Sequence, residues 1–211
     1  MIKLLLSSFL LITMMSAQAW AMDEESESTT STKATHAQHR GMGKFNDFEI
    51  GAMTWQEDVN AHRSIYSTPI TMQFVGLKGD YSYNHFFSPN WRYHHTAEFA
   101  FGNTKGQGSI PQIGDVLRDQ TWLMAGVSPG LMWRTNPRSE LGFGLPIVYR
   151  YIYWHIQKDS GFSIDKGTSF SVGVSATYVV RFTSRHSVHV SVEQQHMWNT
   201  VIWSGGFDWI F

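Results

Sequence analysis

Three side chains near the C-terminus are of the types that carry nucleophilic catalysis. His189, Ser191 and Glu193 occupy alternate positions, so on a β-strand all three would share one face. A hydroxyl, an imidazole and a carboxylate can act as nucleophile, base and orienting group. The same three residue types also occur in polar interiors. The element that carries them therefore decides between a catalytic and a structural interpretation.

The ten histidines raise the question of a metal site. Only His94 and His95 are adjacent, and neighbouring residues of a strand face opposite sides, so this pair is poorly placed to bind one ion. His36 and His39 lie in a polar segment and are expected to be solvated. We predict no metal and no cofactor, and we place His95 among interfacial aromatic residues.

Alternation of large apolar residues with small or polar ones dominates the chain from residue 41 onward. It is clearest in 141–153 and 170–182, where every second residue is apolar or aromatic. Both segments exceed ten residues, which suits a tilted strand that crosses a bilayer in about 9 to 11 residues. Aromatic residues gather toward the segment ends, and the opposite face carries Gly, Ser and Thr with isolated charges. This is typical of a membrane barrel with a narrow polar lumen, and a soluble barrel or sandwich is the alternative.

The same pattern predicts eight strands, which makes the chain an all-β, transmembrane, antiparallel up-and-down β-barrel. The expected strands are 45–56, 70–83, 91–103, 120–134, 139–155, 168–182, 187–197 and 201–211. Long connections, 57–69, 104–119 and 156–167, alternate with short ones such as 135–138 and 183–186, as outer loops alternate with periplasmic turns in bacterial barrels. Splitting the loop around 103–119 would give ten strands, an alternative that stays open.

Composition narrows the function classes. The 211 residues are 42% hydrophobic, 15% aromatic and only 16% charged, with a formal net charge of −1. No basic surplus is available to neutralise phosphates, so we expect no nucleic-acid partner. The absence of cysteine excludes disulfides, thiolate metal sites and thiol catalysis.

The N-terminal segment has the features of an export signal. Lys3 precedes the apolar run 4–15, and 19–21 reads Ala-Trp-Ala, a cleavage pattern of small residues. We predict that 1–21 is a signal peptide and that the polar segment 22–40 is a disordered periplasmic leader, because it has too little apolar surface to offset its ordering entropy. A single membrane anchor would need about 20 apolar residues.

The final strand ends on alternating aromatic residues and a terminal phenylalanine. Ser204, Gly206, Trp209 and Phe211 fill the polar, glycine, aromatic and final phenylalanine positions of a pattern that resembles the C-terminal signal of bacterial outer-membrane barrels. Recognition by the assembly machinery through strand addition is what this resemblance implies. Residues 41–211 as a whole resemble the small eight-stranded barrels typified by the OmpA membrane domain, OmpX and the opacity proteins.

The resemblance implies an exported protein of the Gram-negative outer membrane with a structural or adhesive role. Its expected partners are outer-membrane lipid and lipopolysaccharide, the assembly machinery, and a host or phage surface ligand bound by the loops. The side chains that alternation turns inward form a nearly balanced set expected to plug the lumen. They are Lys78, Asp80, Arg92, His94, Glu98, Arg150, Arg181, His189, Ser191, Glu193 and Asp208.

Two alternatives to the structural or adhesive role remain. The spacing of His189 and Ser191 is similar to that of the outer-membrane lipid A deacylases, which are also small eight-stranded barrels, and would imply a lipid A hydrolase. In that family the acid comes from farther along the chain, whereas Glu193 is on the same strand, and alternation turns all three residues toward the lumen. The other alternative is a small-solute channel.

Overall fold

The computed structural model describes residues 43–63, 66–107, 120–154, 162–164 and 168–211. The expected signal peptide and leader, 1–40, lie outside them. The described strands are β1 (Lys44–Arg63), β2 (Tyr66–Phe86), β3 (Trp91–Gln107), β4 (Thr121–Asn136), β5 (Ser139–Gly144), β6 (Ile147–Tyr153), β7 (Phe162–Ile164), β8 (Thr168–Arg181), β9 (His186–Gln195) and β10 (Thr200–Ile210). None of the described residues forms a helix long and apolar enough to span a membrane.

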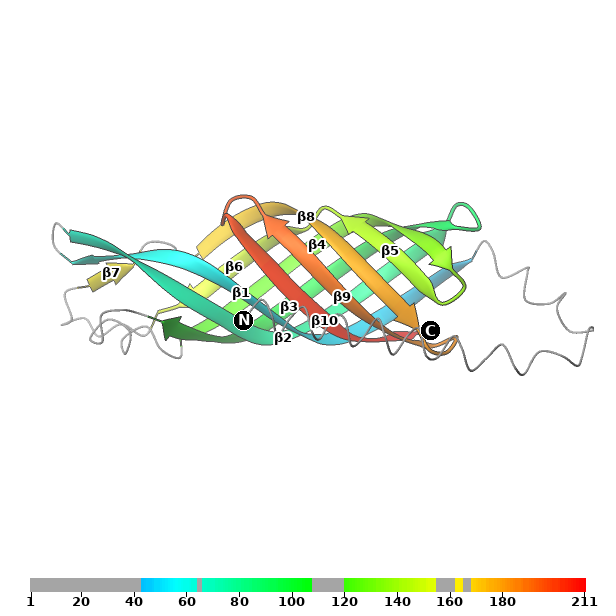
Figure 1. Ribbon diagram of the computed structural model, residues 1–211, viewed down its shortest axis with the longest axis horizontal. Coiled ribbons are helices and arrows are strands. Elements are labelled where there is room, and N and C mark those ends of the chain that lie inside the picture. Colours follow the sequence, from blue (N-terminus) through cyan, green and yellow to red (C-terminus); the bar gives the residue numbers. More distant parts are fainter. Residues whose placement is uncertain (1–42, 64–65, 108–119, 155–161, 165–167) are drawn as a thin grey trace, which may run out of the picture. The chain divides into compact units, whose positions relative to one another are not determined.

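The strands form a closed antiparallel barrel (Figure 1). The order around the wall is β1, β2, β3, β4, then β5 with β6, then β8, β9 and β10, and β10 pairs with β1 to close the sheet. Both β5 and β6 pair with β4 on one side and β8 on the other, so they are two halves of one barrel strand. Within the described part of the chain the barrel therefore has eight strands, which confirms the predicted fold class over the ten-strand alternative.

Two prolines explain the interruption between β5 and β6. Pro146 lies between β5 and β6, and Pro129 on β4 lies opposite Leu145, so neither proline can donate a ladder hydrogen bond. The amide of Leu145 still donates to the carbonyl of Pro129 at 2.9 Å, and the amide of Gly173 donates to the carbonyl of Pro146 at 2.8 Å. The wall is therefore irregular here but stays hydrogen-bonded.

The two ends of the barrel differ. At one end, which we call the turn end, the short segments 87–90, 137–138 and 182–185 connect the strands, and both strand ends of the barrel, near 44 and 210, lie there. At the other, the loop end, lie the longer connections. The sequence prediction was wrong about one of these, because 57–69 is mostly strand and not loop.

This segment forms an arm that projects at the loop end (Figure 1). Pairing of β1 with β10 ends at Trp55, but pairing with β2 continues to Arg63 and Tyr66. Eight further residues span about 25 Å of strand, and β7 pairs with the tip of β1. The prediction failed because the outward positions of the arm are polar, such as Gln56 and Asp58, so they lack the lipid-facing signature of the other strands.

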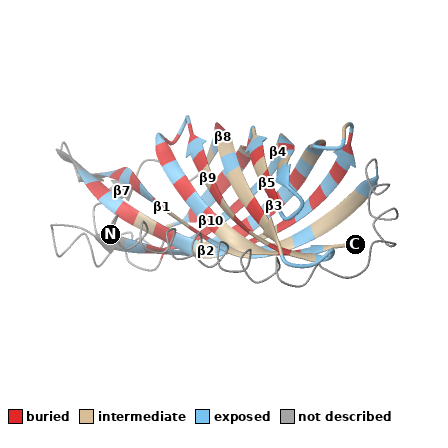
Figure 2. Ribbon diagram, turned by 45° about the vertical axis from the view of Figure 1, so that its right-hand side comes forward, coloured by how far each residue is buried: buried red, intermediate tan, exposed pale blue. Residues whose placement is uncertain are grey.

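Burial in the barrel is the reverse of that in a soluble sandwich (Figure 2). Outward apolar side chains are exposed, with Leu77 at 54% and Val127 at 52%, whereas inward Lys78 and Glu98 are 7% and 5% exposed. Figure 2 shows buried and exposed positions alternating along the strands. A surface of this kind is stable only where hydrocarbon replaces water.

The loop half of the lumen corrects another expectation, because it is apolar where sequence analysis predicted a polar interior. We call this layer the apolar collar. Trp55 stacks on Phe74 at 4.5 Å and meets the edge of Trp122 at 4.8 Å. Alternation missed part of the collar because the outer neighbours of Phe74 and Trp122, which are Val75 and Leu123, are apolar as well. Its members are Met53, Trp55, Val59, Ile70, Met72, Phe74, Ala100, Trp122, Met124, Val148, Ile152, Trp198 and Ile202.

A charged residue on the outward face should destabilise the barrel more in the middle of the membrane than near its surface. Val127 lies in the middle of β4 and Val201 at the loop end of β10, and both are exposed. In lipid vesicles, Val127→Lys should lower the free energy of unfolding by about 2 to 4 kcal/mol, and Val201→Lys by about 0 to 1 kcal/mol, because the second ammonium reaches the interface. Reversible urea unfolding measures both variants. Equal losses would contradict a membrane-spanning barrel in this orientation.

Candidate functional site

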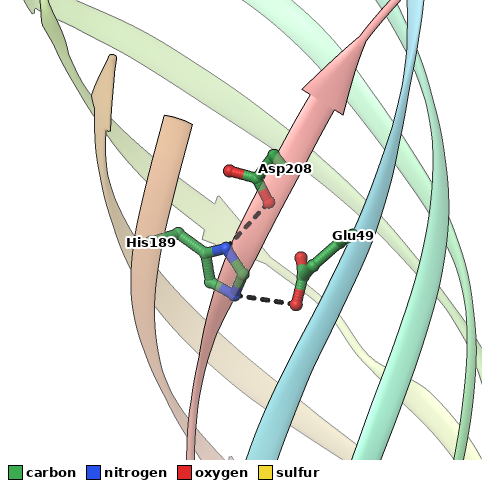
Figure 3. Close-up of side chains that lie close together, drawn as sticks. All are labelled: Glu49, His189 and Asp208. Atoms are coloured by element: carbon green, nitrogen blue, oxygen red, sulfur yellow. Dashed lines mark hydrogen bonds and ion pairs between the residues drawn. The ribbon is translucent and has the colours of Figure 1, made fainter. Parts of the chain in front are cut away.

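A cluster of three titratable side chains lies where the first and last strands meet (Figure 3). Glu49 of β1 and Asp208 of β10 are directly paired across the seam. His189 of β9 places Nδ1 at 2.9 Å from Asp208 Oδ1 and Nε2 at 2.7 Å from Glu49 Oε1. Its ring thus extends over β10 to contact β1. We call Glu49, His189 and Asp208 the seam clasp.

Small residues make this contact possible. His189 is paired in register with Gly206, which lies between it and β1. A Cβ at position 206 would lie 2.9 Å from Cε1 of His189 and 2.9 Å from Cα of Gly51, closer than side chains tolerate. Ser187 Oγ donates to Asp208 Oδ2 at 2.8 Å and fixes the carboxylate from the other side.

The clasp was tested as a metal site because its potential ligand atoms lie within 4.8 Å of one another. The two carboxylates, however, face different nitrogens of one imidazole. These nitrogens point away from each other, so one ion cannot use His189 together with both acids. The arrangement instead suits an imidazole that carries both protons and lies between two carboxylates.

The predicted hydrolytic residues lie on one inner face of β9 but have different partners. His189 faces the two acids of the clasp, and Ser191 Oγ lies 2.6 Å from Ser204 Oγ. Glu193 accepts from Gln195 Nε2 at 3.3 Å and lies 3.6 Å from Lys78 Nζ. The base does not face the hydroxyl and the acid does not face the base, so these three residues do not form a nucleophile, base and acid triad.

A second set of charges centres on Lys78. Its Nζ lies 2.9 Å from Asp80 Oδ2 and 3.1 Å from Glu98 Oε2. Asp80 and Glu98 are direct cross-strand partners, a repulsive placement for two carboxylates. Lys78 offsets that repulsion. Beside it lies a cavity of about 60 Å³, lined in part by Glu49, Lys78 and Glu193, which is large enough for a few water molecules.

The remaining residues of the predicted lumen network lie on either side of this layer, toward the loop end or toward the turn end. Arg150 is in the apolar collar, where NH1 donates to Glu57 Oε2 and NH2 donates to Glu57 Oε1 at 3.2 Å. His94 lies toward the turn end, with Nδ1 at 2.8 Å from Asn84 Oδ1 and Nε2 at 2.8 Å from Thr96 Oγ1. Arg92 and Arg181 both contact Glu140 at the turn end.

Sequence reasoning missed three acids that hold these partners. Glu49, Glu57 and Glu140 each face a cation or imidazole from the inner wall. Glu140 is near a turn, and Glu57 fell in a segment expected to be a loop. The charge balance gave no signal for them, because the expected inward set already paired four Lys or Arg residues with four acids.

The residues of the predicted assembly signal divide between the two faces of β10. Ser204 is buried in the lumen, and Gly206 lies beside the clasp. Trp209 and Phe211 are exposed on the outer face. Their role in assembly remains a prediction.

Loss of the clasp should weaken the seam specifically. His189→Gln removes the charged bridge and leaves two buried carboxylates, a change that costs about 3 to 5 kcal/mol. We expect faster unfolding in urea, followed by the loss of the compact band on unheated gels. A disulfide between I50C and F207C, which are paired across the seam, should restore slow unfolding.

The matched control is a disulfide between L77C and F101C, an outward pair of β2 and β3. Because the native chain has no cysteine, each variant contains only the intended pair. Equal rescue by both disulfides would show that His189 supports the barrel generally and not the seam.

No known family and no curated protein matches the sequence. The structure is similar to outer membrane protein OprG from Pseudomonas aeruginosa, at a TM-score of 0.50 and 10% identity, covering 81% of this chain and 97% of that protein. It also matches Ail, the attachment invasion locus protein of Yersinia pestis, at a TM-score of 0.44 and 16% identity. That match covers 79% of this chain and 99% of Ail. Neisserial surface protein A matches at a TM-score of 0.41 and 14% identity, and the match covers 77% of this chain and 96% of that protein. The chain has the fold of the small eight-stranded outer-membrane barrels.

Proposed function

We propose that this protein is an outer-membrane barrel that acts at the cell surface as a structural and surface-binding protein, with a lumen that does not conduct. The observation that carries the proposal is the combination of a lumen closed by the apolar collar with an arm that projects from the loop end. A barrel sealed inside and extended outside is suited to contact and not to transport.

The closed lumen rests on packing. Trp55, Phe74 and Trp122 are 2% exposed or less, and Trp55 of β1 contacts both Phe74 of β2 and Trp122 of β4. The guanidinium of Arg150 lies 4.2 Å from the ring centroid of Trp198 and is paired with Glu57, so the one ion pair described within the collar is also covered. An eight-stranded barrel is only wide enough for its own side chains.

The arm supplies the binding surface. Strand pairing stiffens it from Trp55 to Arg63, and the short strand β7 adds a third strand at its tip. Thr71 Oγ1 donates to Asp58 Oδ1 at 2.7 Å across its outer face. Side chains held on a paired strand lose less entropy on binding than those of a free loop. Host molecules, phage and lipopolysaccharide are the candidate ligands.

The proposed orientation puts the turn end in the periplasm and the arm outside the cell. It requires export with cleavage of 1–21, and insertion guided by the C-terminal signal. Membrane fractionation should recover the chain with the outer membrane, and unheated samples should migrate faster on gels than boiled ones. Recovery of the mature chain as a water-soluble periplasmic monomer would overturn the proposal.

Planar-bilayer recording tests the closed lumen. The wild-type barrel should show no steady openings. The triple variant Trp55→Ala, Phe74→Ala and Trp122→Ala should conduct, because it removes three aromatic rings from the collar. Trp203→Ala with Trp133→Ala, on the outer face, is the control and should remain silent. Steady openings of the wild-type protein would contradict the proposal and favour the channel alternative.

A shortened arm tests surface binding. Replacing 60–69 with Asn-Gly joins Val59 to its partner Ile70 through a two-residue turn and leaves the barrel intact. Bacteria that display this variant should adhere to epithelial monolayers several-fold less than bacteria displaying the wild-type chain, at equal surface amounts and with unchanged heat-modifiable mobility. Equal adhesion of the two strains would remove the arm as the binding surface.

A further inference from the structure

Three guanidinium groups converge on one carboxylate at the turn end of the lumen. Arg92 Nε and NH2 donate to Glu140 Oε2 at 3.1 and 2.7 Å. Arg181 NH2 lies 3.1 Å from Glu140 Oε1, and Arg134 Nε lies 3.5 Å from the same oxygen. We call Arg92, Arg134, Arg181 and Glu140 the arginine cluster. It differs from the charged layer around Lys78, where acids outnumber the base.

The cluster carries more positive charge than Glu140 neutralises. The nearest further acid on this layer, Asp47, accepts from Asn84 Nδ2 at 3.1 Å, and even with it three cations face two anions. An uncompensated charge in a narrow, partly dry interior is costly, so an additional anion would stabilise the folded barrel.

The donors of the cluster are also incompletely used. The Nε–H groups of Arg134 and Arg181 are buried and make no hydrogen bond to the described residues, although Arg134 Nε lies within ion-pair distance of Glu140. Arg92 and Glu140 are buried, but the side chains of Arg134 and Arg181 are 29% and 17% exposed, so the cluster is open to the outside at the turn end. A ligand that approaches from that end would meet these two guanidinium groups first.

Aromatic rings hold the guanidinium planes in place. Arg92 and Arg181 lie over Phe45, at 5.2 and 5.6 Å from the ring centroid, and Arg134 lies over Phe86 at 4.8 Å. Stacking covers the faces of the guanidinium groups and leaves their edges to donate. Such edges match the oxygens of a phosphate group in paired hydrogen bonds.

Position in the barrel points to the source of the phosphate. Phe87, Tyr83 and Tyr93 are exposed on the outer face at the turn end, where aromatic residues mark the level of lipid headgroups. Glu140 and Asp47 face the arginines and Asn84 at this end, whereas Lys44 and Arg185 are exposed. An anionic headgroup therefore meets no competing exposed acid among the described residues of this rim.

We propose that the arginine cluster binds the phosphate group of an anionic phospholipid at the turn end of the barrel. Arg134 and Arg181 receive the phosphate, Arg92 stays paired with Glu140, and Glu140 acts as the internal competitor of the ligand. The lipid assignment rests on the proposed membrane location, whereas the anion site rests on the cluster alone.

The experiment uses the full mature barrel in a phosphate-free maltoside detergent at fixed ionic strength. Phosphatidylglycerol, inorganic phosphate, or a galactolipid with the same acyl chains is added. The readouts are the NMR shifts of the arginine Nε–H groups and the midpoint of thermal unfolding. Arg134→Gln with Arg181→Gln removes the site, and Arg138→Gln with Arg185→Gln is the matched control, which removes two exposed arginines outside the cluster.

Phosphatidylglycerol should shift the Nε–H signals of Arg134 and Arg181 and raise the midpoint by several degrees, and the galactolipid should do neither. The cluster variant should lose the response and the control should keep it. Glu140→Gln should strengthen binding roughly tenfold, the equivalent of about one charge-assisted hydrogen bond, while lowering the midpoint without lipid.

Other results would overturn the proposal. Equal responses in the cluster variant and the control would show general surface attraction. Saturation by inorganic phosphate with no competition from the lipid would keep an anion site but remove the lipid assignment. A barrel that folds, shows heat-modifiable mobility and responds to neither anion would remove the site while leaving the proposed function standing. Failure to insert into membranes at all would count against the proposed function.

Discussion

A charge inside this barrel is stable only next to an opposite charge. The outer surface is apolar around the wall, and the lumen is too narrow for bulk water. An isolated ion there would lose most of its solvation free energy. The pairs Arg150 with Glu57, Lys78 with Glu98 and Arg92 with Glu140 are the consequence. Lys78 and Glu98 connect adjacent strands, and the other two pairs connect strands that are not adjacent in the sequence. The ion pairs therefore also hold the strands of the wall in place.

This requirement divides the lumen into layers with different properties. The apolar collar closes the loop half, where Arg150 is covered by Trp198 and tied to Glu57. The charged layer around Lys78 has an excess of acids and retains a small cavity. The arginine cluster at the turn end has the opposite excess. The formal charges of these two layers are therefore of opposite sign.

Alternation was enough to predict the barrel but not the contents of its lumen. A strand that faces lipid must be apolar on every second residue, so 141–153 and 170–182 can be recognised as strands from the sequence. The inner face obeys only the rule that its residues satisfy one another. Trp55 and Trp122 do so by an edge-to-face contact, and because the outer neighbour Leu123 is also apolar, the sequence does not show which side of β4 faces the lumen. The partners of His189 come from β1 and β10, and no local sequence pattern predicts a contact between residues 49 and 189.

The seam shows how such a distant pairing constrains the last strand. Glycine at position 206 was expected from a resemblance to an assembly signal, which concerns recognition before the barrel closes. In the closed barrel the same position lies beneath the His189 ring and against Gly51, where a Cβ has no room. The two reasons are independent, because one acts through a partner and the other through packing within the chain. A larger residue at 206 would obstruct the path of His189 to Glu49 even if recognition tolerated it. The identity of this residue is therefore determined by barrel closure as well as by any signal it carries.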